Sequence, residues 1–485
     1  MNLLGLLQQR SGDAPLWLTP AGSHSAAQAL RSAAALRRTW ASAGGRAVAV
    51  WAHDALLFGH AVLALDGFAS RLLLLPAALP ANDAQAACRE GGVDFIVADV
   101  PTAASDAMPQ RLPADLPPGG DGNAGQIADH GALATEWVLA TSGTTGLPKL
   151  VSHTLATLAA TVQSDERQGT QLVWGLLYDP ARFAGLQVFL QALAGGSALC
   201  LPDRGEAMPA QVQAMAAAGV NALSATPTLW RRLLMSTAVG SLPLGRVTMG
   251  GEIADAPLLR RVTLAFPGAR VRHIYASTEA GVGFSVADGL EGFPAAWLAT
   301  PPAGIELAIA ADELAPDEGE LLIRSSRLAS RYLGQVLPKD DQGWLRSGDR
   351  VRRLDGRVTF MGRLGGCINI GGDKVFPEAV ERVLLAWPGV LAATVRGRRS
   401  AFTGALVEAT VVLTPGAGSG DQIRSMLLAH CRAVLPRAAV PGVLRFAADL
   451  GLSDVGKQLR VAAARRGSAP AACFESGRRC PPRAS

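Results

Sequence analysis

Lysine is scarce in this chain of 485 residues. Of its 45 basic residues only four are lysines, and the rest are arginines. Lysine carries a compact charge on a flexible stem and arginine a rigid planar fork, so the two residues are not interchangeable. Each lysine therefore needs its own explanation, and the four are Lys149, Lys339, Lys374 and Lys457.

Long apolar runs are also missing. The stretch 56–76 is interrupted by His60, Asp66 and Arg71, which makes it too polar to span a bilayer. The first residues, MNLLGLLQQR, lack both the basic start and the long apolar segment of a secretory signal. We therefore exclude an integral membrane protein and expect a cytoplasmic location.

Cysteine is too sparse for a disulfide scaffold, and its spacing fits no metal site. The chain also has no large excess of positive or negative charge. Its net charge is +5, and residues 462–485 contribute +4 of it, from five arginines and one acidic residue, Glu475. Because the body of the chain is nearly neutral, a nucleic-acid-binding protein is not expected. The six cysteines are Cys88, Cys200, Cys367, Cys431, Cys473 and Cys480.

Alternating helical and strand-like segments predict an α/β fold. An Ala-rich helical pattern covers 25–42, and a strand is expected at 47–52. Residues 101–133 predict a surface loop, because they are rich in Pro, Gly, Ala and Asp. Further strands predict a mostly parallel sheet with helical crossovers; they lie at 136–141, 172–178, 198–202, 245–251 and 270–277.

The pattern changes beyond residue 300, where shorter strands predict a different architecture. We expect a large N-terminal domain over 1–363, a small α+β domain over 364–462 and a disordered basic tail over 463–485. The small domain should contain helices at 377–385 and 421–434, and strands at 392–396 and 404–413.

The segment 141–149, TSGTTGLPK, has the composition of a phosphate-binding loop. Its glycines let backbone amides face a common anion, its hydroxyls add donors, and its lysine adds a charge. The Walker pattern does not fit. The loop resembles that of the adenylate-forming superfamily, which includes acyl-CoA synthetases. By this resemblance the nucleotide-binding residues here are Thr141, Ser142, Gly143, Thr144, Thr145, Gly146 and Lys149.

Further segments, in the order that the family requires, strengthen the resemblance. Residues 274–279, IYASTE, resemble the family's YGxTE motif, with Ala276 in place of its glycine. The resemblance implies that Tyr275 stacks on adenine, Thr278 contacts phosphate and Glu279 holds Mg²⁺, beside Ala276 and Ser277. A carboxylate is the oxygen ligand that Mg²⁺ prefers. Gly250, Gly251 and Glu252 resemble the adenine-side loop.

The remaining motifs lie nearer the C-terminus. GWLRSGD at 343–349 resembles GWxxTGD, which implies that Asp349 binds the ribose diol, and Arg363 would reach the nucleotide. Gly371, Gly372 and Lys374 fall in the segment that would face the thiol. Lys457, in GLSDVGK, would enter the site during adenylation.

The chain departs from the family pattern at two places. Arg182 stands where many members carry a gating histidine; it either binds a substrate carboxylate, pairs with Asp179 or caps a helix. Gly365 stands at the hinge, where Asp or Lys is usual. Trp174, Phe183, Leu186, Val282, Gly283 and Phe284 are candidates for the acyl pocket, which favours a hydrophobic or aromatic acid, although the same apolar residues suit a core.

The resemblance implies an ATP-dependent carboxylate–CoA ligase. ATP, Mg²⁺ and CoA are the expected cofactors, and a carboxylic acid is the expected substrate. Two alternatives remain open: a stand-alone enzyme that loads an acyl-carrier protein, and a nucleotide-binding homologue without catalysis. The oligomeric state is not predicted.

Overall fold

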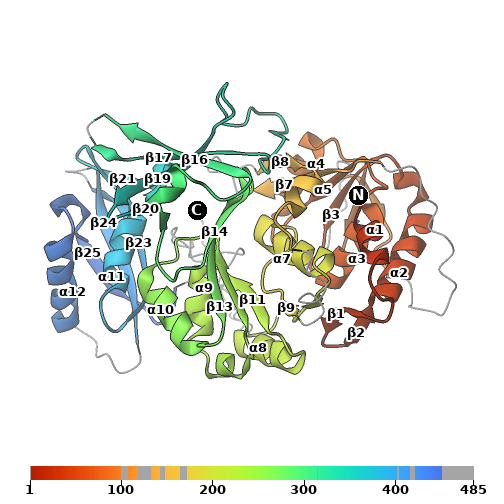
Figure 1. Cartoon of the computed structure of the whole chain (residues 1–485), viewed down its shortest axis with the longest axis horizontal. Coiled ribbons are helices and arrows are strands. Elements are labelled where there is room, and N and C mark those ends of the chain that lie inside the picture. Colours follow the sequence, from red (N-terminus) through yellow and green to blue (C-terminus); the bar gives the residue numbers. More distant parts are fainter. Residues whose placement is uncertain are drawn as a thin grey trace, which may run out of the picture.

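The computed structural model describes residues 2–99, 108–116, 133–141, 148–163, 172–313, 315–400, 404–414 and 421–450. The predicted α/β fold is confirmed: sheets with parallel centres are flanked by helices. Figure 1 shows the N-terminal segments at one side, the C-terminal segments at the other, and the segments of the middle of the chain between them.

The largest sheet of the described residues has eight strands, and its central pairs are parallel. Antiparallel pairs close both edges. In spatial order the strands are β14 (Gly281–Val286), β13 (Arg270–Ser277), β12 (Arg246–Gly250), β11 (Ala222–Ala225), β9 (Val173–Gly175), β10 (Ala198–Cys200), β1 (Pro15–Thr19) and β2 (Gly22–Ser25).

A second sheet of seven strands is parallel except at the edge formed by β18, β8 and β7. Its order is β18 (Arg331–Tyr332), β8 (Lys149–His153), β7 (Glu136–Thr141), β4 (Arg71–Leu74), β3 (Ala47–Trp51), β5 (Phe95–Ala98) and β6 (Gln110–Leu112). Strand β6 corrects the prediction of a surface loop over 101–133, because it pairs in parallel with β5.

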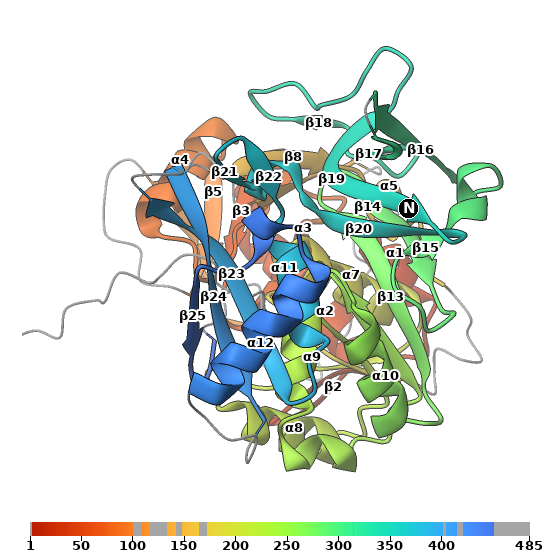
Figure 2. The same ribbon diagram turned by 90° about the vertical axis from the view of Figure 1, so that its left-hand side faces the viewer.

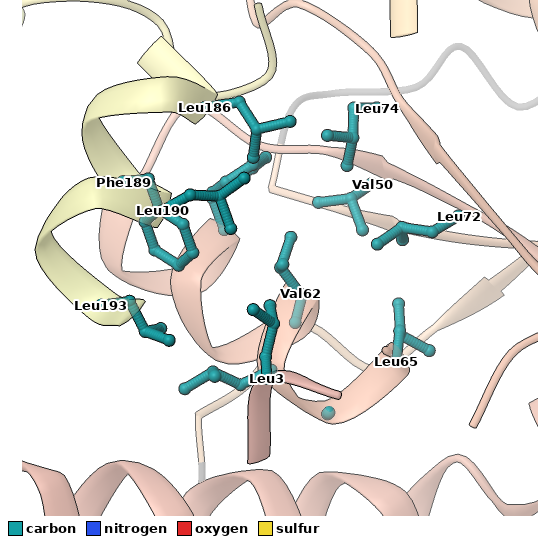
Figure 3. Close-up of a cluster of buried hydrophobic side chains, with 14 of the residues drawn as sticks. Leu3, Val50, Val62, Leu65, Leu72, Leu74, Leu186, Phe189, Leu190 and Leu193 are labelled. Atoms are coloured by element: carbon teal, nitrogen blue, oxygen red, sulfur yellow. The ribbon is translucent and has the colours of Figure 1, made fainter. Parts of the chain in front are cut away.

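Helices cover both sheets. They are α1 (Leu3–Gln8), α2 (Ala26–Thr39), α3 (Ala55–Leu65), α4 (Ala81–Glu90), α5 (Leu155–Ala159), α7 (Phe183–Ala194), α8 (Met208–Ala217), α9 (Pro227–Leu233) and α10 (Ala256–Ala265). Helix α7 packs into the same core as α3 and the seven-stranded sheet. Figure 3 shows Leu186, Phe189, Leu190 and Leu193 of α7 lying against Leu3, Val62 and Leu74.

The antiparallel third sheet has, among the described residues, the order β15 (Phe293–Pro294), β20 (Arg357–Arg363), β19 (Leu345–Leu354), β17 (Ala315–Ser325) and β16 (Ile305–Asp312). The short 3₁₀ helix η4 (Leu364–Gly366) follows β20 directly. The boundary predicted at 363–364 therefore falls where a strand ends, and it stays a prediction.

The C-terminal elements agree closely with the prediction. Two helices, α11 (Pro377–Leu385) and α12 (Asp421–Val434), pack on a sheet in which β24 lies between β23 and β25 (Figure 2). The strands are β21 (Ile368–Ile370), β22 (Asp373–Val375), β23 (Val390–Ser400), β24 (Gly404–Leu413) and β25 (Val443–Phe446). The predicted tail at 463–485 lies outside the described residues.

Strands β11 to β13 have two chemically different faces because side chains alternate along a strand. Leu223, Val247 and Met249 are buried in a core with α8, α9 and α10. The residues between them, such as Ser224 and Thr248, point to the other face, where a cavity lies. This face therefore lines the cavity with side chains that the core of α8, α9 and α10 does not use.

No helix within the described ranges is long and apolar enough to cross a bilayer.

The buried His60 should make stability depend on pH. It is 3% exposed, its ring meets Trp17 edge-on, and burial, with a contribution from His24, lowers its pKa to about 3. In the unfolded chain His60 binds a proton as the pH falls through about 6.5, whereas in the folded chain it stays neutral until the pH approaches 3. The contribution of His60 to the free energy of unfolding is therefore present above pH 6.5 and is lost as the pH falls toward 3.

Between pH 7 and pH 5 the loss from His60 should be about 2 kcal/mol. His60→Leu removes the titration while keeping an apolar side chain of similar volume. Its free energy of unfolding in urea should fall less over this interval than that of the unchanged chain. Equal losses in the two proteins would contradict the assignment.

Candidate functional site

A cavity of about 840 Å³ lies between helix α7 and the open face of strands β11 to β14. Its volume lies within the range of small-molecule sites. The cavity brings together most of the predicted site residues of the large domain that the structure describes. They are Thr141, Arg182, Phe183, Gly250, Gly251, Ala276, Ser277, Thr278, Glu279, Val282, Gly283 and Arg363.

The predicted phosphate loop joins two paired strands. Thr141 ends β7, Lys149 begins β8, and the two residues are direct antiparallel partners. The Thr141 hydroxyl donates to the Lys149 carbonyl at 3.4 Å. Ser142, Gly143, Thr144, Thr145 and Gly146 lie outside the described residues. The strand pair thus fixes where the loop begins and ends.

Lys149 and Glu279 are linked through Tyr332, a residue that the sequence did not single out. The Lys149 ammonium lies 5.3 Å from the centre of the Tyr332 ring. The Tyr332 hydroxyl donates to Oε1 of Glu279 at 2.9 Å. Burial and the Glu279 carboxylate raise the pKa of Tyr332, which keeps its hydroxyl protonated as a donor. Tyr332 therefore orients the carboxylate that was predicted to hold the metal.

The turn that carries Thr278 is held by a buried histidine. Nε2 of His153, at the end of β8, lies 2.7 Å from the Thr278 carbonyl oxygen. Because a carbonyl only accepts, this nitrogen donates. Burial lowers the pKa of His153, so the ring is neutral at physiological pH. Thr278 and Glu279 thus occupy a β13–β14 turn that two residues of the neighbouring sheet hold in place.

Asp349, Arg363 and Tyr275 form a second polar cluster. Asp349 and Arg363 are opposite each other in the β19–β20 pair. Nε of Arg363 lies 2.9 Å from Oδ1 of Asp349, and the Tyr275 hydroxyl donates to Oδ2 at 2.6 Å. Burial and the nearby carboxylate raise the pKa of Tyr275, so it remains the donor. The predicted ribose-binding carboxylate is therefore held from both sides.

The Tyr275 ring stacks against Phe284 and Phe360, each at a centroid distance of 5.2 Å. The register of the β13–β14 pair shifts directly after Tyr275, a bulge of the kind often found beside active sites. The prediction that Tyr275 stacks on adenine stays a prediction, and in this structure the ring is packed against two phenylalanines.

The glycine-rich end of β12 reaches the cavity. Gly251 has φ +81°, a conformation that favours glycine, and Gly250 is paired with Ile274 of β13. Glu252 points elsewhere: its Oε2 accepts from the Thr228 amide, in the first turn of α9. Glu252 was predicted as nucleotide-binding, yet it holds a helix start here and is absent from the cavity lining.

Arg182 is the N-terminal cap residue of α7, without a side-chain capping hydrogen bond. The neighbouring Asp179 is buried, and its carboxylate accepts from the Ala77 and Ala181 amides and lies 3.6 Å from Arg204. Arg182 reaches the cavity with Phe183. Of the three roles considered for Arg182, side-chain capping is not observed.

The predicted apolar pocket residues divide between two places. Trp174 and Phe284 line the cavity together with Val282 and Gly283. Leu186 does not: it is fully buried in the core between α7 and the seven-stranded sheet (Figure 3). The adjacent residues Gly185 and Gln187 line the cavity instead, because successive side chains of a helix point in different directions.

The C-terminal candidates lie on a hairpin. Gly371 and Gly372 form the two-residue turn between β21 and β22, with φ +59° and +103°. Both positive values favour glycine at this turn. Lys374 is exposed beside it. Lys457 lies outside the described residues.

His153 and Tyr332 are the residues that sequence reasoning missed. His153 lies four residues after Lys149 on β8, and this even spacing puts both on one face of the strand. That spacing is a signal that could have found it. Tyr332 offers no such local signal, because its contacts are with residues more than fifty positions away.

Comparison with known families gives two consecutive matches. Residues 23–333 match the AMP-binding enzyme model, and residues 379–457 match the AMP-binding enzyme C-terminal domain.

Curated relatives differ greatly in length. The chain is 29% identical to the phenyloxazoline synthase MbtB of Mycobacterium sp. (strain MCS), over 65% of this chain and 27% of that protein. It is also 29% identical to a probable 2-succinylbenzoate–CoA ligase of Mycobacterium tuberculosis (strain ATCC 25618 / H37Rv), over 70% of this chain and 86% of that protein. The chain therefore spans much less than two thirds of the synthase and most of the ligase.

Solved structures share the fold along nearly the whole chain. The anthranilate CoA ligase AuaEII with anthranoyl-AMP superimposes with a TM-score of 0.78 at 17% identity, covering 94% of this chain and 95% of that one. The o-succinylbenzoate CoA synthetase of Bacillus subtilis with OSB-AMP gives 0.71 at 19% identity, covering 95% and 97%.

We expect Gly185 to be required for the close packing of the first turn of α7 against the backbone of Asp179. A β-carbon there would lie 2.1 Å from the Asp179 carbonyl oxygen. A helical glycine replaced by alanine usually gains up to about 1 kcal/mol. Gly185→Ala should instead lose about 1–3 kcal/mol because the turn must shift.

Urea denaturation measures this difference. Gly240→Ala is the matched control, since nothing lies within 4 Å of a β-carbon at that glycine. A stabilised Gly185→Ala protein would show that the close approach imposes no constraint.

Proposed function

The chain belongs to the AMP-binding enzyme family, and on this premise we propose that it activates a carboxylic acid with ATP and transfers the acyl group to CoA. A carboxylate oxygen attacks the α-phosphorus, and the bond to pyrophosphate breaks. The CoA thiolate then attacks the acyl carbon of the adenylate and releases AMP. The observation that carries the proposal is the group of charged residues at the cavity: Glu279 and Arg363 line it, and Tyr332 connects Glu279 to the ammonium of Lys149.

The residues around the cavity fit ATP and Mg²⁺ in their chemistry. Gly250 and Gly251 present backbone without β-carbons, which suits the close approach of a flat base. Asp349 offers a carboxylate, the group that can accept from both hydroxyls of a ribose. Glu279 offers the hard oxygen ligand that Mg²⁺ requires. Bound there, Mg²⁺ would neutralise charge on the phosphate oxygens.

Each side chain has a role in positioning or in electrostatics. Lys149 places a positive charge at the exit of the phosphate loop, and Thr278 offers a hydroxyl to phosphate. Tyr332 fixes one oxygen of Glu279, so that its carboxylate is oriented before the metal binds. Such prior orientation lowers the barrier because little reorganisation remains at the moment of reaction.

We propose that the domain of residues 364–462 moves between the two steps. Its present contacts with the large domain include two ion pairs, Arg232 with Asp449 and Arg382 with Glu291, and the stacking of Arg350 over the Phe376 ring. Gly365 sits in η4 with no atom near a β-carbon position, which suits a hinge. Lys457 serves the first step and the Gly371–Gly372 turn serves the second.

One comparison makes CoA the preferred thiol. The curated ligase that the chain covers most fully, at 86% of its length, is named as a CoA ligase. Several curated relatives are much longer synthases, which keeps an acyl-carrier protein as the alternative. The apolar lining by Trp174, Phe183 and Val282 supports a substrate with an aromatic or alkyl body.

Pyrophosphate release over a panel of carboxylic acids tests the proposal directly. At least one acid should give ATP-dependent pyrophosphate without CoA and an acyl-CoA with CoA. Release of pyrophosphate without any thioester, rescued by a carrier protein, would favour the alternative. A chain that binds ATP but releases no pyrophosphate with any acid would be a nucleotide-binding homologue without catalysis.

Glu279→Gln tests whether metal binding needs the charge of this side chain or only its shape. The amide keeps the volume but loses the charge, so activity should fall about 10²–10³-fold and the Mg²⁺ titration should move to higher concentration. Tyr332→Phe should move the titration in the same direction by less. Glu306→Gln, in an exposed ion pair with Arg324, is the control. An unchanged Mg²⁺ titration in Glu279→Gln would refute the role.

Lys457→Ala should impair one half-reaction selectively. A charge that meets the α-phosphate is worth about 10²–10³ in rate, so adenylate formation should fall by that factor. Thioester formation from supplied acyl-adenylate should change little. The exposed Lys339→Ala is the matched control. Equal loss in both half-reactions would place Lys457 outside the adenylation step.

A further inference from the structure

A row of side chains crosses the cavity-facing side of the eight-stranded sheet, away from the residues assigned to the nucleotide. The β-ladder registers align Trp174 with Ala222, Ala222 with Arg246, and Arg246 with Arg270. Arg272 follows on β13, two residues closer to Thr278. Neighbouring strands lie about 5 Å apart, so this row spans the width of the cavity floor.

Among the described residues of the cavity lining, acids are few beside Arg270 and Arg272. The cavity lining carries two carboxylates, Asp179 and Glu279. Asp179 lies by Arg204, and Glu279 accepts from Tyr332. Within the described ranges, neither Arg270 nor Arg272 forms an ion pair with a carboxylate.

Two other lining arginines, Arg327 and Arg363, have partners that explain their positions. Arg327 donates to the carbonyls of Gly283 and Ala303, which ties β14 to the segment before β16. Arg363 pairs with Asp349. These two arginines are therefore structural or nucleotide-directed, in contrast to Arg270 and Arg272.

Trp174 supplies a second, independent observation. It lines the cavity and is 6% exposed, yet its indole N–H has no acceptor among the described residues. A buried donor without a partner costs about 1–3 kcal/mol. A ligand oxygen placed beside Trp174 would remove that cost.

We propose that the acid substrate carries a second anionic group, a distal carboxylate, which binds between Trp174 and Arg272 with Arg270 at the outer end. This inference rests on the proposed function and names the substrate class of the same site. A planar carboxylate matches the guanidinium fork and accepts the indole N–H as well. The specificity of the cavity is therefore for a dicarboxylic acid.

The distance between the two ends sets the spacer. The reacting carboxylate lies toward Thr278, next to Ala276, and Arg272 lies four residues earlier on β13. Four residues of strand span about 13 Å, part of which the arginine side chain covers. An arene with a short chain, or a chain of several methylenes, joins carboxylates at such a separation. The apolar walls at Val188 and Ile274 suit that spacer.

Matched pairs of acids test this proposal: each pair shares an aryl or alkyl body, and one member bears an added distal carboxylate. Pyrophosphate release should favour the dicarboxylate. Arg272→Met should reduce this preference about 10- to 100-fold. It should do so by slowing pyrophosphate release with the dicarboxylate, while release with the monocarboxylate stays unchanged. Trp174→Phe, which keeps a ring without the N–H, should reduce it less. Arg260→Met, exposed on α10 at the other side of the sheet, should change nothing.

Binding without turnover gives a second readout. Acyl-sulfamoyl adenosine analogues of one pair are titrated by calorimetry into the full chain. Arg272→Met should weaken the dicarboxylate analogue and spare the other, which also shows that the variant is folded.

The outcomes separate this inference from the proposed function. Pyrophosphate release that favours monocarboxylates, or a preference that Arg272→Met leaves unchanged, overturns the inference while the function stands. A selective rise in the KM for CoA would mean that the arginines bind phosphate of CoA, which also overturns it. If no acid of either kind releases pyrophosphate, the proposed function itself fails.

Discussion

Two hydrogen bonds between the large sheets determine the shape of the candidate site. His153 of β8 donates to the Thr278 carbonyl, and Tyr332 of β18 donates to Glu279. Both donors come from the antiparallel edge of the seven-stranded sheet, and both acceptors come from one turn of the eight-stranded sheet. Because β8 also begins with Lys149, the same edge fixes where the predicted phosphate loop ends. The edge formed by β8 and β18 therefore positions Thr278, Glu279 and Lys149 together.

The second constraint is the alternation of side chains on β11 to β13. Val247 and Met249 belong to the core with α8 to α10, whereas Arg246 and Thr248 face the cavity. Helix α7 lies across from this face and contributes to the seven-stranded sheet's core through Leu186 (Figure 3). The cavity thus lies between two packed cores, and three of its lining residues, Trp174, Phe183 and Val188, also belong to the core of α7.

Much of this could be predicted from the sequence, for physical reasons that are local. Residues 377–385, 404–413 and 421–434 follow a helical or strand period closely, and the structure has elements at those bounds. Glycine pairs and a carboxylate after a strand mark the site for the same reason. What escaped depends on distant contacts: β6 is a strand because β5 offers it an edge, Glu252 meets α9, and Tyr332 meets Glu279 only in the folded chain.

The two-faced sheet also has a consequence for how such a protein changes over evolutionary time. Substitutions at Val247 or Met249 alter core volume and are costly. Substitutions at Thr248 or Arg272 leave that core intact, and replacements away from packed or buried networks usually change stability by less than about 0.5 kcal/mol. Substitutions on the cavity-facing side of a strand can therefore change the chemistry of the cavity, while the alternate residues on the other side keep the core and the fold unchanged.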